Sequence, residues 1–161
     1  MKNFQPYFDA VKFLDGLAQI PTKDDYMNGK KHTDIYLKRV RYFLNLLGNP
    51  DRDFKFIHIT GTAGKGSVAQ MTQEVLMAAG KNTGLFTSPF CQTSIEKIRV
   101  NHQYISPREL ADIVEYLKPF IAKAYRQSPY GGPSYFELFF AMALVYFQKR
   151  KCEWVVCEVG A

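Results

Sequence analysis

The sequence contains little cysteine, and its three cysteines do not form a framework. Cys91, Cys152 and Cys157 are odd in number, and no two of them have a Cys-x-x-Cys spacing. A disulfide scaffold uses an even set of cysteines, and a zinc site needs closely spaced cysteines or nearby histidines. We therefore expect reduced cysteines that serve packing, as in a cytoplasmic protein.

Long apolar runs are also missing. Asp9, Lys12 and Asp15 interrupt the N-terminal stretch, which therefore lacks the apolar block of a signal peptide. The most apolar segment, residues 135–147, is too short to cross a bilayer and contains Glu137. We expect no membrane partner and a cytoplasmic location.

Positive charge is present but is not concentrated. The formal net charge is +6, and the densest basic runs are Lys-Lys at 30–31 and Lys-Arg-Lys at 149–151. This balance favours anionic ligands in general, and a solvated basic surface explains it better than a nucleic-acid interface does. We therefore expect no nucleic-acid partner. The 161 residues, 47% of them hydrophobic and 22% charged, are typical of one soluble domain.

Segments of helical periodicity alternate with short apolar runs bounded by turn residues. This alternation predicts an α/β fold with a mostly parallel sheet flanked by helices, and the continuous apolar run at the end predicts a central last strand. We expect a helical segment over residues 1–53 and an α/β core over 54–161 that is incomplete at its C-terminal end. Helices are predicted over residues 6–20, 35–47, 64–79, 106–125 and 134–149, strands over 54–60, 82–87 and 152–160, and an extended segment or hairpin over 98–105.

A glycine-rich loop follows the first predicted strand and leads into a helix. Its glycines lack a Cβ, so successive backbone N–H groups can close around phosphate oxygens while the helix dipole points its positive end at them. Lys65 adds a positive charge, and Ser67 offers a hydroxyl to a phosphate-bound magnesium ion. A tight turn beside a solvated lysine is the alternative interpretation. The predicted phosphate-binding residues are Gly61, Thr62, Gly64, Lys65, Gly66 and Ser67.

Polar residues also stand at the ends of the other two strands. Ser88 follows the second strand and Glu158 ends the last one. Ligands of open α/β sheets gather beyond the carboxyl ends of the strands, and a carboxylate there suits a magnesium-nucleotide site. The alternative is that an acidic residue ends a strand only because water begins there, and that Ser88 is a turn residue. Together with the glycine loop, these positions predict a magnesium site made by Ser67, Ser88 and Glu158.

Several motifs in this order resemble the folylpolyglutamate synthase and dihydrofolate synthase family, a branch of the Mur ligases. The similarity spans roughly residues 20–160 and implies the central ATP-binding domain of a Mur ligase, truncated. The motifs are DIYLKRVRYFLNLLGNP from residue 34, GTAGKGS from 61, TSPF from 87, IEKIRVNHQYIS from 95, SYFELFFAMALVYF from 134 and EVG from 158.

This resemblance implies an ATP- and Mg²⁺-dependent ligase that adds L-glutamate to a folate. The γ-phosphoryl group of ATP would pass to a folate carboxylate, and the amine of glutamate would attack the resulting acyl phosphate. Such a transfer depends on positioning and charge neutralisation, so Lys65 is the expected catalytic residue. Asp34, Tyr135 and Phe136 would border the pterin end of the folate, although aromatic side chains here can equally be core packing.

The sequence departs from the family pattern at several positions. Ala63 stands in place of asparagine, Tyr36 and His102 in place of glycines, and Ser134 in place of threonine. Ala63 removes a side-chain amide near the phosphates but leaves the backbone cradle. The family also has a further C-terminal domain that binds glutamate, and we expect ligation to require it.

Two alternatives stay open within this resemblance. One is a bifunctional enzyme that also joins glutamate to dihydropteroate. The other is a non-catalytic fragment that binds ATP. The first differs from the leading hypothesis in accepting dihydropteroate as well, and the second differs in that it catalyses no reaction.

Overall fold

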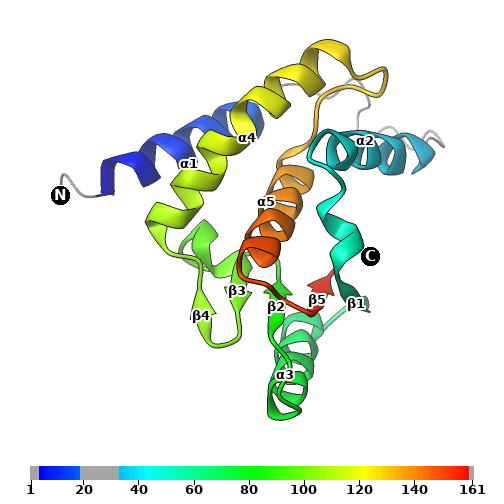
Figure 1. Cartoon of the computed structure of the whole chain (residues 1–161), viewed down its shortest axis with the longest axis vertical. Coiled ribbons are helices and arrows are strands. Elements are labelled where there is room, and N and C mark those ends of the chain that lie inside the picture. The colour runs from blue at the N-terminus through cyan, green and yellow to red at the C-terminus, as the bar shows by residue number, and fades with distance from the viewer. Residues whose placement is uncertain (1–3, 19–32, 160–161) are drawn as a thin grey trace.

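The structure, a computed structural model, describes residues 4–18 and 33–159, which are built around a mixed five-stranded sheet. The strand order is β1-β5-β2-β3-β4, in which β1, β5 and β2 are parallel and β3 and β4 form an antiparallel hairpin at one edge (Figure 1). The predicted parallel sheet is therefore correct for β1, β5 and β2. The strands are β1 (Lys55–Ile59), β2 (Thr83–Phe86), β3 (Ile98–Val100), β4 (Gln103–Tyr104) and β5 (Trp154–Glu158).

The last strand of the described part lies inside the sheet. β5 pairs with β1 on one side and with β2 on the other, in parallel on both sides. Val155 and Val156 have no exposed surface, because both faces of the sheet are covered there. This arrangement confirms the central position that the continuous apolar run predicted.

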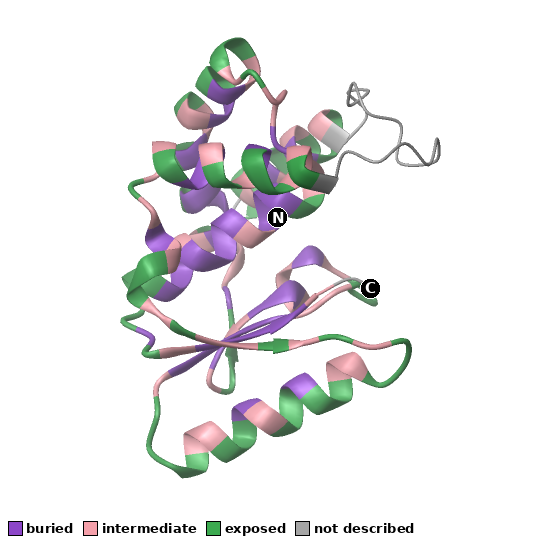
Figure 2. Cartoon of the chain, turned by 90° about the vertical axis from the view of Figure 1, so that its right-hand side faces the viewer, coloured by how far each residue is buried: buried purple, intermediate pink, exposed green. Residues whose placement is uncertain are grey.

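Helices cover the two faces of the sheet unequally (Figure 2). Among the described helices only α3 lies on one face, whereas α5 covers the other, where α1 and α4 pack against α5 and α2 packs against α4. The helix predicted over residues 6–20 is confirmed as far as residue 18, and its last two residues lie outside the described part. No helix of the described part has the length and apolar character to span a membrane. The helices are α1 (Gln5–Ala18), α2 (Thr33–Leu46), α3 (Lys65–Ala78), α4 (Pro107–Gln127) and α5 (Tyr135–Lys149), and η2 (Pro50–Asp53) and η3 (Ser94–Lys97) are short 3₁₀ helices.

Side chains cap the start of α4 and of α5. The Glu109 N–H donates to Ser106 Oγ at 3.2 Å, and the Ser106 N–H donates to Glu109 Oε2 at 3.0 Å. This reciprocal capping box was predicted from the sequence. Ser134 and Glu137 form the same box at the start of α5.

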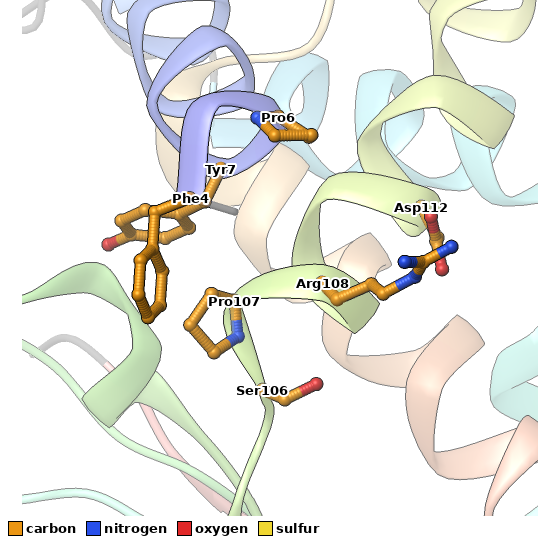
Figure 3. A pocket seen from close by; sticks show the side chains of 7 residues that line it. All are labelled: Phe4, Pro6, Tyr7, Ser106, Pro107, Arg108 and Asp112. Atoms are coloured by element: carbon orange, nitrogen blue, oxygen red, sulfur yellow. The ribbon is translucent and has the colours of Figure 1, made fainter. Parts of the chain in front are cut away.

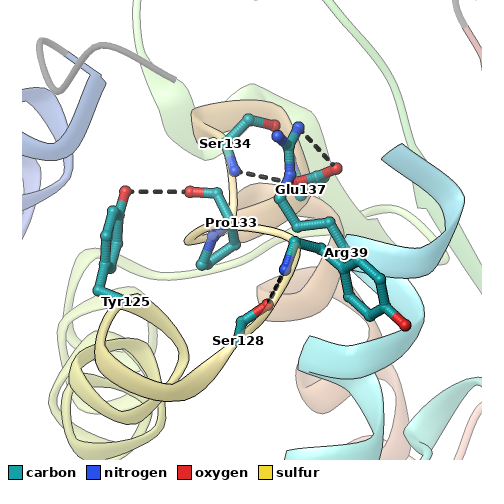
Figure 4. A network of polar contacts seen from close by, with 7 residues as sticks. Arg39, Tyr125, Ser128, Pro133, Ser134 and Glu137 are labelled. Atoms are coloured by element: carbon teal, nitrogen blue, oxygen red, sulfur yellow. Dashed lines mark hydrogen bonds and ion pairs between the residues drawn. The ribbon is translucent and has the colours of Figure 1, made fainter. Parts of the chain in front are cut away.

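The capping glutamate of α5 also makes a buried ion pair with α2 (Figure 4). Arg39 donates from Nε to Glu137 Oε2 at 2.8 Å and from Nη2 to Oε1 at 3.1 Å. Arg39 is 4% exposed and Glu137 is 8% exposed, so each buried charge is compensated by the other. The pair fixes α2 against the N-terminal end of α5.

A small core and one buried amide hold α3 on its face of the sheet. Ala69, Leu85 and Val156 are buried together under this helix. The Gln73 side chain is fully buried, and its amide donates to the Thr83 carbonyl at 2.9 Å while its oxygen accepts from Arg99 Nε at 2.8 Å. These contacts connect α3 with β2 and β3 and thereby fix the direction of the helix.

We predict that the buried pair between α2 and α5 contributes much more to stability than an exposed pair. Arg39→Met should lower the free energy of unfolding by about 3–5 kcal/mol, because it leaves the Glu137 carboxylate buried without a counter-charge. The control is Lys81→Met, which removes an ion pair with Glu153 that is exposed on both sides and should cost less than about 1 kcal/mol. Urea unfolding measures both values, and equal losses would contradict the assignment.

Candidate functional site

The glycine-rich loop lies between β1 and α3 and has the backbone that glycine favours. Gly61 has a φ of +150° and Gly64 a φ of +74°, in a region that other residues rarely adopt. Gly64 is the N-cap of α3, and no side chain caps the helix. The first turn of α3 therefore directs N–H groups, without a capping acceptor, toward the space beyond β1.

Lys65 is the first residue of α3 and folds back over the loop. Its Nζ donates to the carbonyl of Gly61 at 3.0 Å. The side chain is half-buried, so the ammonium stays at the loop instead of extending into solvent. The loop thus combines oriented N–H groups with a positive charge.

Glu158 ends β5 beside this loop. It is 5% exposed, and its Oε2 accepts the backbone N–H of Ser88 at 3.0 Å. A Cβ on Gly66 would lie only 3.7 Å from the same oxygen, so the carboxylate approaches the first turn of α3 closely. The other oxygen, Oε1, accepts no hydrogen bond from any described residue. The structure therefore brings together Gly66, Ser88 and Glu158, which are distant in the sequence.

A short hydrogen-bonded segment supports the loop that carries Ser88. The Glu96 carboxylate accepts the backbone N–H groups of Cys91, Gln92 and Thr93, each at 2.9 Å. These hydrogen bonds, the one from Cys91 first, lower the pKa of Glu96 below its ordinary value. We did not predict this cap from the sequence, although Thr-x-x-Glu is a capping-box pattern.

The residues predicted to border a folate are only partly brought together. Tyr135 and Phe136 begin α5, and the Phe136 ring lies 5.6 Å from the ring of Phe86 at the end of β2. Phe136 is 41% exposed, whereas the Tyr135 ring packs 4.8 Å from that of Phe139. Asp34 is exposed in the first turn of α2 and makes no hydrogen bond or ion pair with the residues that the structure describes.

The oxygen atoms beside the loop fit a small, hard cation. Mg²⁺ is commonly held by one or two carboxylates, with phosphate oxygens and water completing its shell. Glu158 is the carboxylate beside the loop, and Ser67 in the first turn of α3 and Ser88 after β2 are residues with hydroxyl groups. No group of three or more His, Cys, Asp or Glu side chains suited to a metal occurs among residues 4–18 and 33–159.

A separate pocket of about 380 Å³ lies between the start of α1 and the start of α4 (Figure 3). The Tyr7 hydroxyl on its wall lies 2.6 Å from Thr93 Oγ1 and thus connects α1 with the segment after Ser88. None of the sequence-predicted site residues lines the pocket. Its lining residues are Phe4, Pro6, Tyr7, Ser106, Pro107, Arg108 and Asp112.

Comparisons by sequence and by structure both find folylpolyglutamate synthases as similar proteins. Dihydrofolate synthase/folylpolyglutamate synthase from Bacillus subtilis is 37% identical over 158 residues, which cover 98% of this chain and 34% of the relative. Folylpolyglutamate synthase from Mycobacterium tuberculosis complexed with ADP matches with a TM-score of 0.81 and 30% identity, over 96% of this chain and 32% of that one. An FPGS-AMPPCP-folate complex matches with a TM-score of 0.78 and 30% identity, over 95% of this chain and 35% of that one.

The match covers nearly all of this chain but only part of each relative. The chain spans about a third of the length of the relatives that it matches. No family model matches the chain.

We predict that thiol labelling reports whether Cys152 and Cys157, which lie before and within β5, are buried. Burial raises the pKa of Cys152 and of Cys157 to about 12, and Glu158 adds to the effect on Cys157. At about pH 8 these two thiols should stay protonated and unreactive, whereas the exposed Cys91 should react with a disulfide reagent. Labelling before and after unfolding in urea should give one and then three reacted thiols, located by mass spectrometry. Equal rates for Cys157 and Cys91 would show that β5 is open.

Proposed function

The chain belongs to the folylpolyglutamate synthase and dihydrofolate synthase family, of whose members it spans about a third, and we propose that it forms the ATP-binding part of a ligase that joins glutamate to folate. The observation that carries this proposal is the approach of the Glu158 carboxylate to the uncapped first turn of α3. The relatives solved with ADP and with AMPPCP and folate support it.

The loop would bind the phosphates of ATP. Gly61, Thr62 and the first turn of α3, from Gly64 to Ser67, would surround the phosphate oxygens with N–H groups. Lys65 would exchange the Gly61 carbonyl for a phosphate oxygen and offset part of its negative charge. Ala63 brings no side-chain donor, so the cradle would consist of backbone groups and this lysine.

Magnesium would be held on the other side of the phosphates. Ser67, Ser88 and Glu158 are the residues that would contribute oxygen atoms to it. When bound, the ion would neutralise charge on the transferring phosphoryl group. The hydrogen bond from the Ser88 N–H keeps the Glu158 carboxylate in position for this role.

The reaction would begin with transfer of the γ-phosphoryl group to a carboxylate of the folate. A carboxylate is a poor electrophile, but an acyl phosphate has a good leaving group, which the amine of L-glutamate would displace. Lys65 and the loop N–H groups would hold the phosphoryl group in line with the attacking oxygen. Asp34, Tyr135 and Phe136 would border the pterin end, with the exposed face of Phe136 as a surface for a flat ring.

Other parts of the proposal concern the whole protein. A helical segment over 1–53 and an α/β core over 54–161 would form one ATP-binding domain, and a further domain that binds glutamate would be needed for ligation. We place the protein in the cytoplasm, without a nucleic-acid or membrane partner. Without this second domain the protein would be a non-catalytic fragment that binds ATP.

A bifunctional enzyme is the second candidate. The Bacillus subtilis relative, 37% identical, is both a dihydrofolate synthase and a folylpolyglutamate synthase by name. In that case dihydropteroate would be a further acceptor for glutamate. The two candidates are separated by assaying the addition of glutamate to folate and to dihydropteroate, with a protein that includes the glutamate-binding domain.

We predict that Lys65→Ala weakens binding of magnesium-AMPPCP by at least about tenfold, because the phosphates lose their cationic partner. Lys81→Ala is the matched control, since Lys81 is an exposed lysine beyond the other end of α3. Isothermal titration of the three proteins at one salt concentration measures the effect. Unchanged affinity in Lys65→Ala, or an equal loss in Lys81→Ala, would refute the role of Lys65.

A further inference from the structure

Residues 88–93, which we call the Ser88 segment, lie between β2 and η3 and contain no helix or strand. The two ends of the segment are nevertheless held together. The N–H of Thr87, directly before the segment, donates to the carbonyl of Lys97 at 3.1 Å, and Lys97 directly precedes β3. The segment is therefore a closed loop whose base lies at β2 and β3.

One carboxylate holds three consecutive amides of this loop. Glu96 Oε2 accepts the N–H of Cys91, and Oε1 accepts those of Gln92 and Thr93, each at 2.9 Å. Hydrogen bonds to an ionised carboxylate are stronger than those between neutral groups. Glu96 thus fixes the backbone over the second half of the Ser88 segment.

A helix from the start of the chain holds the same half of the segment. The Tyr7 hydroxyl of α1 lies 2.6 Å from Thr93 Oγ1 and 3.4 Å from Ser94 Oγ. Its ring forms part of the pocket wall between α1 and α4 (Figure 3). The position of α1 is therefore coupled to the loop through a hydroxyl group 86 residues away in the sequence.

The first half of the segment reaches the candidate site. The Ser88 N–H donates to Glu158 Oε2 at 3.0 Å. Two residues later, the Phe90 ring centre lies 5.2 Å from Nζ of Lys97, a cation–π contact with a lysine that is only 6% exposed. Ser88 is thus joined to the amides that Glu96 holds by a short stretch with contacts of its own.

These contacts matter because the two sides of the metal site are held differently. Glu158 belongs to β5, whose hydrogen bonds to two strands fix its backbone. Ser88 lies outside every helix and strand, so its position depends on the contacts of the Ser88 segment. Mg²⁺ demands near-ideal octahedral geometry, and groups that orient its ligands therefore affect its affinity.

We propose that Glu96 and Tyr7 are positioning residues for the metal side of the site, which act by holding the Ser88 segment so that Ser88 stays beside Glu158. This inference rests on the proposed function. It assigns to both residues an effect on the magnesium-dependent part of nucleotide binding, which is separate from the contacts of Lys65 with the phosphates.

The test compares Glu96→Ala, Glu96→Gln and Tyr7→Phe with the wild-type chain. The controls are Glu115→Ala and Tyr116→Phe, which remove the same groups from the exposed face of α4. AMPPCP is titrated once with Mg²⁺ and once with EDTA, and the backbone amide NMR signal of Gly66 follows binding down to weak affinities. Urea unfolding gives the stability of each protein.

We expect Glu96→Ala to bind AMPPCP about tenfold more weakly than wild type with Mg²⁺, and to change by less than about twofold with EDTA. Glu96→Gln keeps one acceptor oxygen and should show a smaller loss. Tyr7→Phe removes one hydrogen bond and should lose about threefold, again only with Mg²⁺. Both controls should behave as wild type in both titrations.

Other outcomes overturn the inference. If Glu96→Ala keeps its affinity with Mg²⁺, or loses affinity equally with Mg²⁺ and with EDTA, Glu96 has a structural role only. The same pattern in Tyr7→Phe would remove α1 from the inference. Wild-type protein that binds AMPPCP equally well with and without Mg²⁺ would refute the metal side and leave the phosphate loop intact. Failure to bind AMPPCP at all would instead count against the proposed function.

Discussion

The hydrogen bond from the Ser88 N–H to Glu158 joins the ends of two neighbouring strands beside the first turn of α3. It requires β5 to lie inside the sheet, next to β2, with Phe86 opposite Cys157 in the register. Gly66 adjoins the same carboxylate, since a Cβ there would be in van der Waals contact with Glu158 Oε2 at 3.7 Å. A buried acid is thereby placed at the positive end of a helix, an arrangement suited to a metal ion and phosphate.

The starts of the helices differ in whether a side chain caps them. α4 and α5 begin with capping boxes that satisfy their own N–H groups, and the cap of α5 is further fixed by Arg39. α3 begins at Gly64 without a side-chain cap. An anionic ligand would satisfy N–H groups that the chain itself leaves available, so binding would complete this part of the fold.

Local signals in the sequence were enough to predict most of the elements. The glycines of the loop, the Ser106 capping box and the continuous apolar run of β5 each act within a few residues, and the structure confirms the two helix starts and the strand that they predicted. Contacts between distant segments were not predictable in this way. Arg39 and Glu137 are 98 residues apart, so no periodic pattern indicated their pairing. The antiparallel hairpin stayed an alternative because strands of two or three residues leave a weak pattern.

The central claim is that the first turn of α3 and Glu158 together bind a metal-nucleotide complex. Paramagnetic broadening of backbone amide NMR signals by Mn²⁺ with AMPPCP tests it most directly, because broadening depends steeply on the distance to the ion. We predict strong broadening at Gly66, Ser67, Ser88 and Glu158, with no effect at Asn101 in the turn of the β3–β4 hairpin. Broadening centred elsewhere, or the same pattern in Glu158→Gln, would contradict it.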